Sequence, residues 1–211
     1  MRLTALLLLL STLLLGCSSA YYDAMEKVGI HKRDILVDRV EDANQAQIDA
    51  QAEFSDALSA LQAFTGYQGG DLEQMYKRIN QQYEDSQAAA DEVTKRIDAI
   101  EDVADALFQE WYNELALYND ASLRRSSEAT LKQTEREYQT MIRAMRTAEA
   151  SMSPILLTLL DNTLYLKHNL NAAAIGSLDR EFADLERDIS AAIAEMNRAI
   201  AESEAFIRRL Q

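Results

Sequence analysis

The sequence predicts an all-α fold: an elongated antiparallel helical bundle of about four long helices with coiled-coil-like heptad packing. Apolar residues recur in steps of three and four along most of the 211-residue chain, which is the spacing of one helix face. The chain has only six Gly and one Pro, too few turn residues for a β-sandwich or barrel. No stretch sustains the period-two alternation that a half-buried strand requires.

Glycine divides the chain into four expected helices, at about residues 26–65, 71–119, 123–175 and 177–210, within one helical domain over residues 26–211. The segment Gly66–Gly70 is the strongest break, with Asp71 as the N-cap of the second helix. Gly176 is expected to end the third helix, with Ser177 as the N-cap of the fourth.

Each expected helix has an apolar or small-residue seam that would face its neighbours. On the first it consists of Leu36, Val40, Ala43, Gln47, Ala50, Phe54, Ala57, Leu61 and Phe64. On the second it includes Ile79, Tyr83, Ser86, Ala90, Val93, Ile97, Ile100, Ala104, Leu107 and Trp111. On the third it includes Leu131, Thr134, Tyr138, Met141, Met145, Ala148 and Met152. On the fourth it includes Leu178, Phe182, Leu185, Ile189, Ala192, Met196, Ala199, Ser203, Phe206 and Leu210.

No Gly or Pro separates the second helix from the third. The seam slips by one residue between them, which is about 100° of helix rotation, so we expect a turn near residues 119–123. One continuous helix from Asp71 to Met152 is the alternative. Pro154 is expected to kink the third helix or restart it, because Pro removes an intrahelical hydrogen bond.

The N-terminus reads as a lipoprotein signal peptide over residues 1–16. Arg2 precedes an apolar run of 13 residues, which fits the roughly 7–15 residues of a signal peptide. A membrane span would need about 20 residues. The run ends Leu14-Leu15-Gly16-Cys17, which resembles the lipobox of bacterial lipoproteins.

The lipobox resemblance implies that Cys17, the only cysteine, is lipidated, with residues 17–25 as anchor and tether. It places the protein in the envelope of a Gram-negative bacterium, at the outer membrane and facing the periplasm. The alternative is a secretory signal followed by an incidental Cys. A single Cys also excludes an internal disulfide and a Cys-pair metal site.

The charge balance excludes one class of partner. Asp and Glu number 35 against 21 Lys and Arg, a net charge of −14, whereas a nucleic-acid binder needs a basic stripe. No phosphate-binding loop, nucleophile elbow or zinc-protease pattern occurs. We therefore expect neither an enzyme nor a metal or cofactor, although the abundant carboxylates leave a hydrolase of cell-wall glycan open.

Two polar motifs contain the only His residues. The first consists of His31, Lys32, Arg33 and Asp34, and the second of Lys167, His168, Asn169 and Asn171. A small ligand or metal held near both motifs is an alternative function. It requires the chain to reverse at Pro154, because an up-and-down layout otherwise separates the two His by tens of Å.

Trp111 lies on the second seam and is expected to pack in the core, with a partner anchor as its alternative role. The leading hypothesis is a non-enzymatic periplasmic scaffold or protein-interaction module. Its partners would be the membrane, through lipidated Cys17, and a protein partner or a second copy of the chain.

Three segments resemble an uncharacterised family of proteobacterial lipoproteins catalogued as a domain of unknown function. They are residues 21–40, Leu107–Trp111 and Tyr165–Ala172. The resemblance covers nearly all of the mature chain and supports the lipoprotein interpretation. It implies no mechanism and no catalytic residue.

Overall fold

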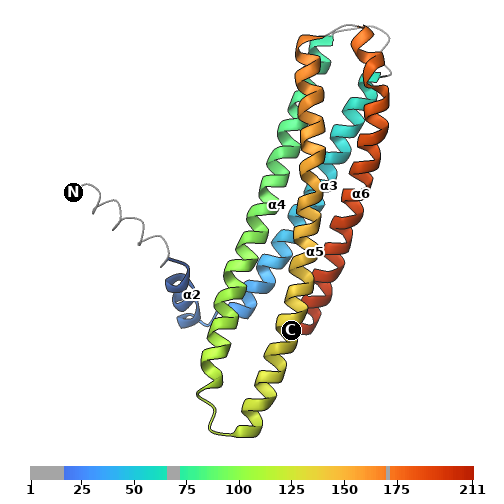
Figure 1. Cartoon of the computed structure of the whole chain (residues 1–211). Helices are drawn as coiled ribbons and strands as arrows, with labels where there is room; N and C mark the ends of the chain where they lie inside the picture. The colour runs from blue at the N-terminus through green and yellow to red at the C-terminus, as the bar shows by residue number, and fades with distance from the viewer. Residues whose placement is uncertain (1–16, 66–71, 170–171) are drawn as a thin grey trace, which may run out of the picture.

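A computed structural model describes residues 17–65, 72–169 and 172–211 (Figure 1). The helices in these ranges are α2 (Cys17–Lys27), α3 (Lys32–Thr65), α4 (Leu72–Leu115), α5 (Ala121–His168) and α6 (Ala172–Leu210). The described residues contain no strand. The prediction of an all-α protein with four long packed helices is therefore confirmed, and a short helix precedes them.

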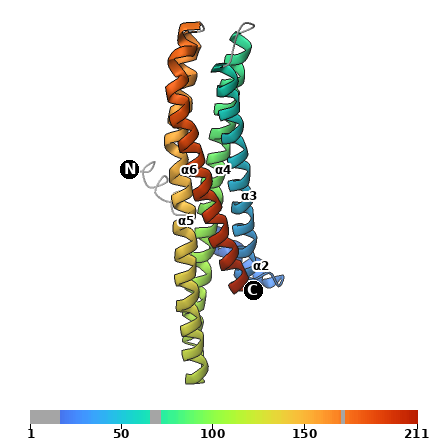
Figure 2. The same cartoon turned by 90° about the vertical axis from the view of Figure 1, so that its right-hand side faces the viewer.

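The four long helices form a bundle in which each packs against two neighbours. Helix α3 contacts α4 and α6, and α5 contacts the same two helices (Figures 1 and 2). The predicted seams supply the core, because most of their members are buried. Fully covered positions include Leu36, Val40, Phe54, Val93, Ile97, Ile100, Leu131, Met145, Met196 and Ala199. The side chains of Phe64 and Leu178 lie outside the described residues.

Helices α4 and α5 are longer than the other two and project past them. They have 44 and 48 residues against 34 in α3 and 39 in α6, and about 1.5 Å per residue makes the longest roughly 72 Å. Ion pairs join Lys32 to Glu110 and Arg209 to Glu137. They mark where α3 begins and where α6 ends beside the two longer helices. We call residues 111–136 the tip and the four-helix part the body; both views show the tip extending alone (Figures 1 and 2).

The expected first helix, residues 26–65, is divided in two, and the expected tether lies within α2. Gly29 has φ +86°. Its N–H donates to the carbonyl of Glu26 at 2.9 Å, and the N–H of Ile30 donates to the carbonyl of Met25 at 3.1 Å. This pair of bonds is the Schellman motif, which needs a left-handed residue such as Gly at the position of Gly29. The sequence prediction missed this break.

Helix α3 begins with its own cap directly after that motif. The carbonyl of His31 accepts the first helical bond, from Ile35 N–H at 3.1 Å. The Asp34 carboxylate accepts from the backbone N–H of His31 at 3.4 Å. An acid three residues after the N-cap makes this reciprocal bond in a capping box.

Helices α4 and α5 are separate, as predicted, and the second begins at a side-chain cap. Asp120 accepts hydrogen bonds from the backbone N–H groups of Ser122 and Leu123 at 2.7 and 3.0 Å. These bonds lower the pKa of Asp120, the bond from Leu123 most. The predicted turn near residues 119–123 thus lies slightly earlier, between Leu115 and Ala121.

Of the two expectations for Pro154, the helix restart is wrong. Pro154 lies inside a continuous α5, where its exposed position leaves the ring in solvent. The predicted boundary at Gly176 is also wrong. Gly176 lies inside α6, which begins at Ala172. Three successive Ala residues favour helix there and outweigh a cost of about 1 kcal/mol for one Gly. The predicted break at residues 66–70 and the cap at Asp71 lie outside the described residues.

Candidate interaction site

Lys32, from the first polar motif, is a buried structural residue. Its side chain is only 6% exposed, and its Nζ donates to Glu26 Oε1 at 2.7 Å and to Glu110 Oε1 at 3.1 Å. Glu26 belongs to α2 and Glu110 to α4. One ammonium therefore joins three helices at the end of the body nearest the tip.

The ionisation of this triad follows from its geometry. The hydrogen bond from Lys32 lowers the pKa of Glu26. Burial raises the pKa of Glu110. Burial opposes the charge on Lys32, but hydrogen bonds to Glu26 and Glu110 outweigh it and raise the pKa of the ammonium. Lys32 thus stays charged because two carboxylates share it.

Tyr22 attaches α2 to the body at a second point. Its hydroxyl donates to Asp102 Oδ2 at 2.6 Å, and its side chain is buried against α4. Burial, followed by this bond to a carboxylate, raises the pKa of Tyr22 well above its usual range. Helix α2 is thus held by two polar contacts and a small apolar contact.

The rest of the first motif faces solvent. His31, Arg33 and Asp34 are exposed, and Arg33 lies 3.8 Å from the Asp34 carboxylate. These residues belong to the cap of α3, so their spacing reflects helix initiation. Among the described residues, no group of three or more His, Cys, Asp and Glu side chains is placed to hold a metal.

The second motif lies at the C-terminal end of α5. Lys167 and His168 are exposed. Asn169 is the C-cap, with its backbone N–H donating to Leu166 O at 3.2 Å and its Nδ2 to Tyr165 O at 2.9 Å. Asn171 lies outside the described residues.

The two His motifs do not share a site. The first precedes α3 at the end of the body nearest the tip, and the second ends α5 at the opposite end (Figure 1). The 34 residues of α3 alone separate these ends by roughly 50 Å, far beyond metal–ligand bonds of about 2 Å.

Cys17 is the first residue of α2, and its side chain is not among those described. Its lipidation stays a prediction. Within the described part of the chain, no helix has both the length and the apolar character needed to cross a bilayer.

Trp111 packs against other residues of its own chain. It is partly buried against the core, and its Nε1 donates to Ser127 Oγ at 2.8 Å. Because Trp111 lies on α4 and Ser127 on α5, the bond closes the base of the tip. This placement agrees with the packing role and leaves little of the side chain for a partner.

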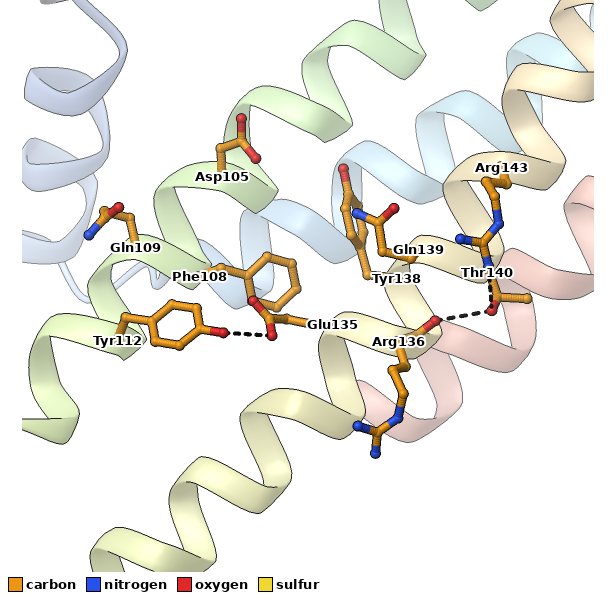
Figure 3. A pocket seen from close by; sticks show the side chains of 10 residues that line it. All are labelled: Asp105, Phe108, Gln109, Tyr112, Glu135, Arg136, Tyr138, Gln139, Thr140 and Arg143. Atoms are coloured by element: carbon orange, nitrogen blue, oxygen red, sulfur yellow. Dashed lines mark hydrogen bonds between the residues drawn. The ribbon is translucent and has the colours of Figure 1, made fainter.

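A hollow in the described surface forms a groove between α4 and α5 at the base of the tip (Figure 3). Its volume is about 880 Å³. Helix α4 supplies one wall and α5 the other, and Figure 3 shows side chains from both helices around the hollow. The lining residues, which we call the groove, are Asp105, Phe108, Gln109, Tyr112, Glu135, Arg136, Tyr138, Gln139, Thr140 and Arg143.

The floor of the groove is aromatic and buried. The rings of Phe108 and Tyr138 meet edge to face with centroids 5.4 Å apart, and the ring centroid of Phe206 from α6 lies 6.3 Å from that of Tyr138. All three are buried. Burial, followed by the charges of Glu101 and Asp105, raises the pKa of Tyr138, so its hydroxyl stays neutral.

The rim combines one bridged pair with two arginines. Tyr112 donates to Glu135 Oε2 at 2.8 Å across the groove (Figure 3); this bond raises the pKa of Tyr112. Neither Arg136 nor Arg143 is within ion-pair distance of a carboxylate among the described residues. By contrast, Arg146 pairs with three carboxylates: Asp98, Glu101 and Glu149.

The sequence prediction missed this groove, although part of its signal was present. Phe108, Trp111 and Tyr112 lie within five residues, and the first two belong to the family-like segment Leu107–Trp111. Their spacing alone predicts core packing. The groove exists because α3 and α6 end beside these residues, and no local pattern shows where a neighbouring helix ends.

Residues 21–210 match the profile of a protein family described as "Protein of unknown function (DUF2959)". No curated protein matches the chain. No solved structure matches it either.

Proposed function

The chain belongs to the DUF2959 family, and from this premise we propose that it is a non-enzymatic, lipid-anchored envelope protein that binds a protein partner through the groove. Cys17 is the proposed lipid attachment site. The proposed location is the periplasmic face of the outer membrane. In this arrangement the body is a rigid support and the groove beside the tip is the recognition surface.

The observation that supports this proposal best is the composition of the groove. Aromatic residues and Arg are enriched in protein interfaces, and they supply most residues that dominate binding energy. The groove offers a fixed aromatic floor, one partly exposed Tyr and two Arg without carboxylate partners. A partner segment that carries both an apolar and an acidic side chain fits it best.

The anchor can be tested separately from the groove. Cys17→Ala should move the protein from the membrane fraction to the soluble periplasmic fraction, because two or more acyl chains are what makes such anchoring stable. Mass spectrometry of the native N-terminal peptide should show a lipid on Cys17. Unchanged membrane retention of the variant would contradict the anchor.

The groove can be tested by site-specific photo-crosslinking in cells. A photoreactive residue in place of Gln139, which lines the groove, should give a discrete protein adduct. Tyr112→Ala combined with Arg143→Glu should abolish that adduct, because it removes an aromatic contact and reverses a charge. The fold should survive, since both side chains are exposed.

A matched control uses the same photoreactive residue at Asp188, an exposed position on α6 away from the groove. It should not give the adduct. If Gln139 and Asp188 give the same adducts, or if the double variant leaves the Gln139 adduct intact, the groove is not the recognition surface.

A further inference from the structure

Helix α2 is attached to the same stretch of α4 that forms one wall of the groove (Figure 1). Its two polar attachment points on α4 are Asp102, which accepts from Tyr22 at 2.6 Å, and Glu110, which accepts from Lys32 at 3.1 Å. The α4 residues 105–109, three of which line the groove, lie between these two points. The short helix and the groove are therefore neighbours.

This attachment places the start of α2 close to the groove. Cys17 precedes Tyr22 by about 7.5 Å of helix rise, and Gln109 follows Asp102 by about 10.5 Å. Packed helix axes lie about 8–10 Å apart. The backbone of Cys17 therefore lies within about 30 Å of Gln109 in the groove. The far end of the body is more distant, since Leu72 at the start of α4 lies about 45 Å from Asp102 along the helix.

The two adjacent tyrosines of α2 face different surroundings. Tyr22 is 5% exposed against α4, whereas Tyr21 is 45% exposed, and their rings meet edge to face with centroids 5.3 Å apart. Tyrosine is enriched where a membrane meets water. Helix α2 can thus keep Tyr22 on the body while Tyr21 lies at the level of the lipid headgroups.

The connection from α2 to the body is short and bonded. Only residues 28–31 separate α2 from α3, and the backbone N–H groups of Gly29 and Ile30 donate back into α2. An extended tether from Cys17 to Lys32 could instead reach roughly 50 Å. Docked α2 therefore replaces a long flexible tether with a short fixed mount.

We propose that docked α2 holds the groove at the surface of the membrane to which Cys17 is attached, so that the partner is a membrane-borne protein. Its recognised segment, which carries an apolar and an acidic side chain, lies within about 30 Å of the bilayer. This inference rests on the proposed function, because it uses both the lipid on Cys17 and the groove. Tyr22 and Lys32 are the positioning residues.

The charge of the molecule makes these positioning contacts necessary. The chain has a net charge of −14, and anionic headgroups repel an acidic protein near their surface. A body on a flexible tether would therefore move away from an anionic membrane. The contacts of Tyr22 and Lys32 keep the groove close to the membrane against this repulsion.

The first test measures the distance from the groove to a membrane by energy transfer. The full lipidated chain is placed in vesicles of phosphatidylethanolamine and phosphatidylglycerol with an acceptor dye on the headgroups. Because the lipid blocks Cys17, the only native Cys, Gln139→Cys supplies one free thiol in the groove for a donor dye. Transfer should be strong, since the groove lies within about 30 Å of the anchor.

Two changes should lower this transfer while the chain stays bound to the vesicles. Tyr22→Asp with Lys32→Met should undock α2, because it places a second carboxylate beside Asp102 and removes the shared ammonium. A flexible Gly/Ser insertion of about 30 residues after Ser19 leaves every contact of α2 intact and adds roughly 30 Å of tether. Arg33→Met, at an exposed position, is the control and should leave transfer unchanged.

The second test identifies the source of the partner in cells. With the photoreactive residue at Gln139, the yield of the adduct should fall roughly tenfold in the undocked variant, because a flexible tether lowers the effective concentration of the groove at the membrane. Arg33→Met should keep the full yield. Any adduct formed by a Cys17→Ala chain should sediment with membranes, since the partner itself is membrane-borne.

The outcomes separate this inference from the function on which it rests. A chain that does not bind vesicles would contradict the lipid anchor, and a wild type without a Gln139 adduct would contradict the groove; either result also removes the inference. Vesicle binding with weak transfer, an adduct unchanged by undocking and by the insertion, or a soluble adduct of the Cys17→Ala chain would overturn the inference alone.

Discussion

The body is stabilised in a different way from α2 and the tip. In the body, four apolar seams meet, and residues such as Ile97, Ile100 and Met145 have no exposed surface. In α2 and the tip, polar contacts carry more of the attachment: the Lys32 triad, the Tyr22–Asp102 bond and the Trp111–Ser127 bond. The tip buries only a short apolar contact, which includes Leu115 and Leu131. Leu117 and Leu123 in the tip are 76% and 60% exposed.

This contrast explains where recognition surfaces occur. The free energy gained by burying apolar surface adds up along a seam, so many residues of the body each contribute part of its stability. A polar contact depends on one geometry, and its loss frees one element. The groove lies at the boundary between the two regions, where the body fixes its aromatic floor and the tip leaves its rim open.

The largest expected effect is a cavity in the body. Ile100→Ala should lower the free energy of unfolding by about 2–5 kcal/mol, because it removes buried methyl groups and leaves a void. Leu117→Ala should change it by no more than about 0.5 kcal/mol, since that side chain is already in solvent. Urea unfolding followed by circular dichroism measures both. Equal effects would remove the distinction between body and tip.

The next effect concerns the Lys32 triad. Lys32→Met keeps the length of the side chain but leaves two neighbouring carboxylates without their cation, and should cost about 1.5–3 kcal/mol in the docking of α2. Amide hydrogen exchange should rise in α2 far more than in the centre of α4. Arg33→Met, at an exposed adjacent position, is the control and should leave exchange unchanged.

The same triad predicts a pH window for α2 docking. The pKa of Glu26 is lowered in the fold, so its contribution is present above the ordinary value of 4.5 and fades as the pH falls below it. The pKa of Lys32 is raised, so its contribution is complete below the ordinary value of 10.5 and is lost as the pH rises further. Glu110, with a raised pKa, partly offsets the loss on the acid side.

This window is measured by α2 exchange, corrected for the intrinsic rate, from pH 4 to 11. Protection should be greatest between the two limits and should fall more steeply on the alkaline side. Tyr22 also titrates in the alkaline range, so Tyr22→Phe is needed beside the wild type. Alkaline loss that disappears in Tyr22→Phe would assign the effect to Tyr22 instead of Lys32.

A smaller effect is expected at Gly29. Gly29→Ala should cost about 1–2 kcal/mol, because a residue with a Cβ is strained in the left-handed region. No atom lies within 4 Å of the added Cβ, so the backbone alone is responsible. Proteolysis between α2 and α3 should accelerate, whereas Val28→Ala, at a 72% exposed position, should behave as wild type. Identical proteolysis rates for Gly29→Ala and the wild type would show that the positive φ at this position does not require Gly.

The sequence was sufficient for the seams because heptad spacing is a local property that packing reinforces. It predicted burial at Val93, Ile97 and Met145, which the structure confirms. Helix ends were harder, since local signals compete. Gly29 and Gly176 look alike in sequence, yet one ends α2 and the other lies within α6. A possible N-cap follows each of them, and what separates them in the sequence is the run of Ala residues before Gly176.

The candidate sites could be predicted least. In the sequence, Lys32 is one member of a polar motif, and its burial could not be predicted because its partner Glu110 lies 78 residues further along the chain. The groove depends on which helix covers which face. It follows from the unequal lengths of neighbouring helices, a tertiary property that no single segment encodes.

The smallest expected effect uses Trp111, the only Trp in the chain, as a reporter for the tip. Its fluorescence should change at a lower urea concentration than the circular dichroism of the whole bundle, because the tip has two helices and the body has four. Trp111→Phe keeps an aromatic ring but removes the hydrogen bond to Ser127, and should lower the free energy of unfolding of the tip by about 0.5–1.5 kcal/mol. Ser127→Ala, which retains the fluorophore, should lower the fluorescence midpoint and leave the dichroism midpoint unchanged. If the fluorescence and dichroism midpoints coincide in both the wild type and Ser127→Ala, tip and body unfold as one cooperative unit. The boundary at residues 111–136 would then describe the shape of the molecule and not a difference in stability.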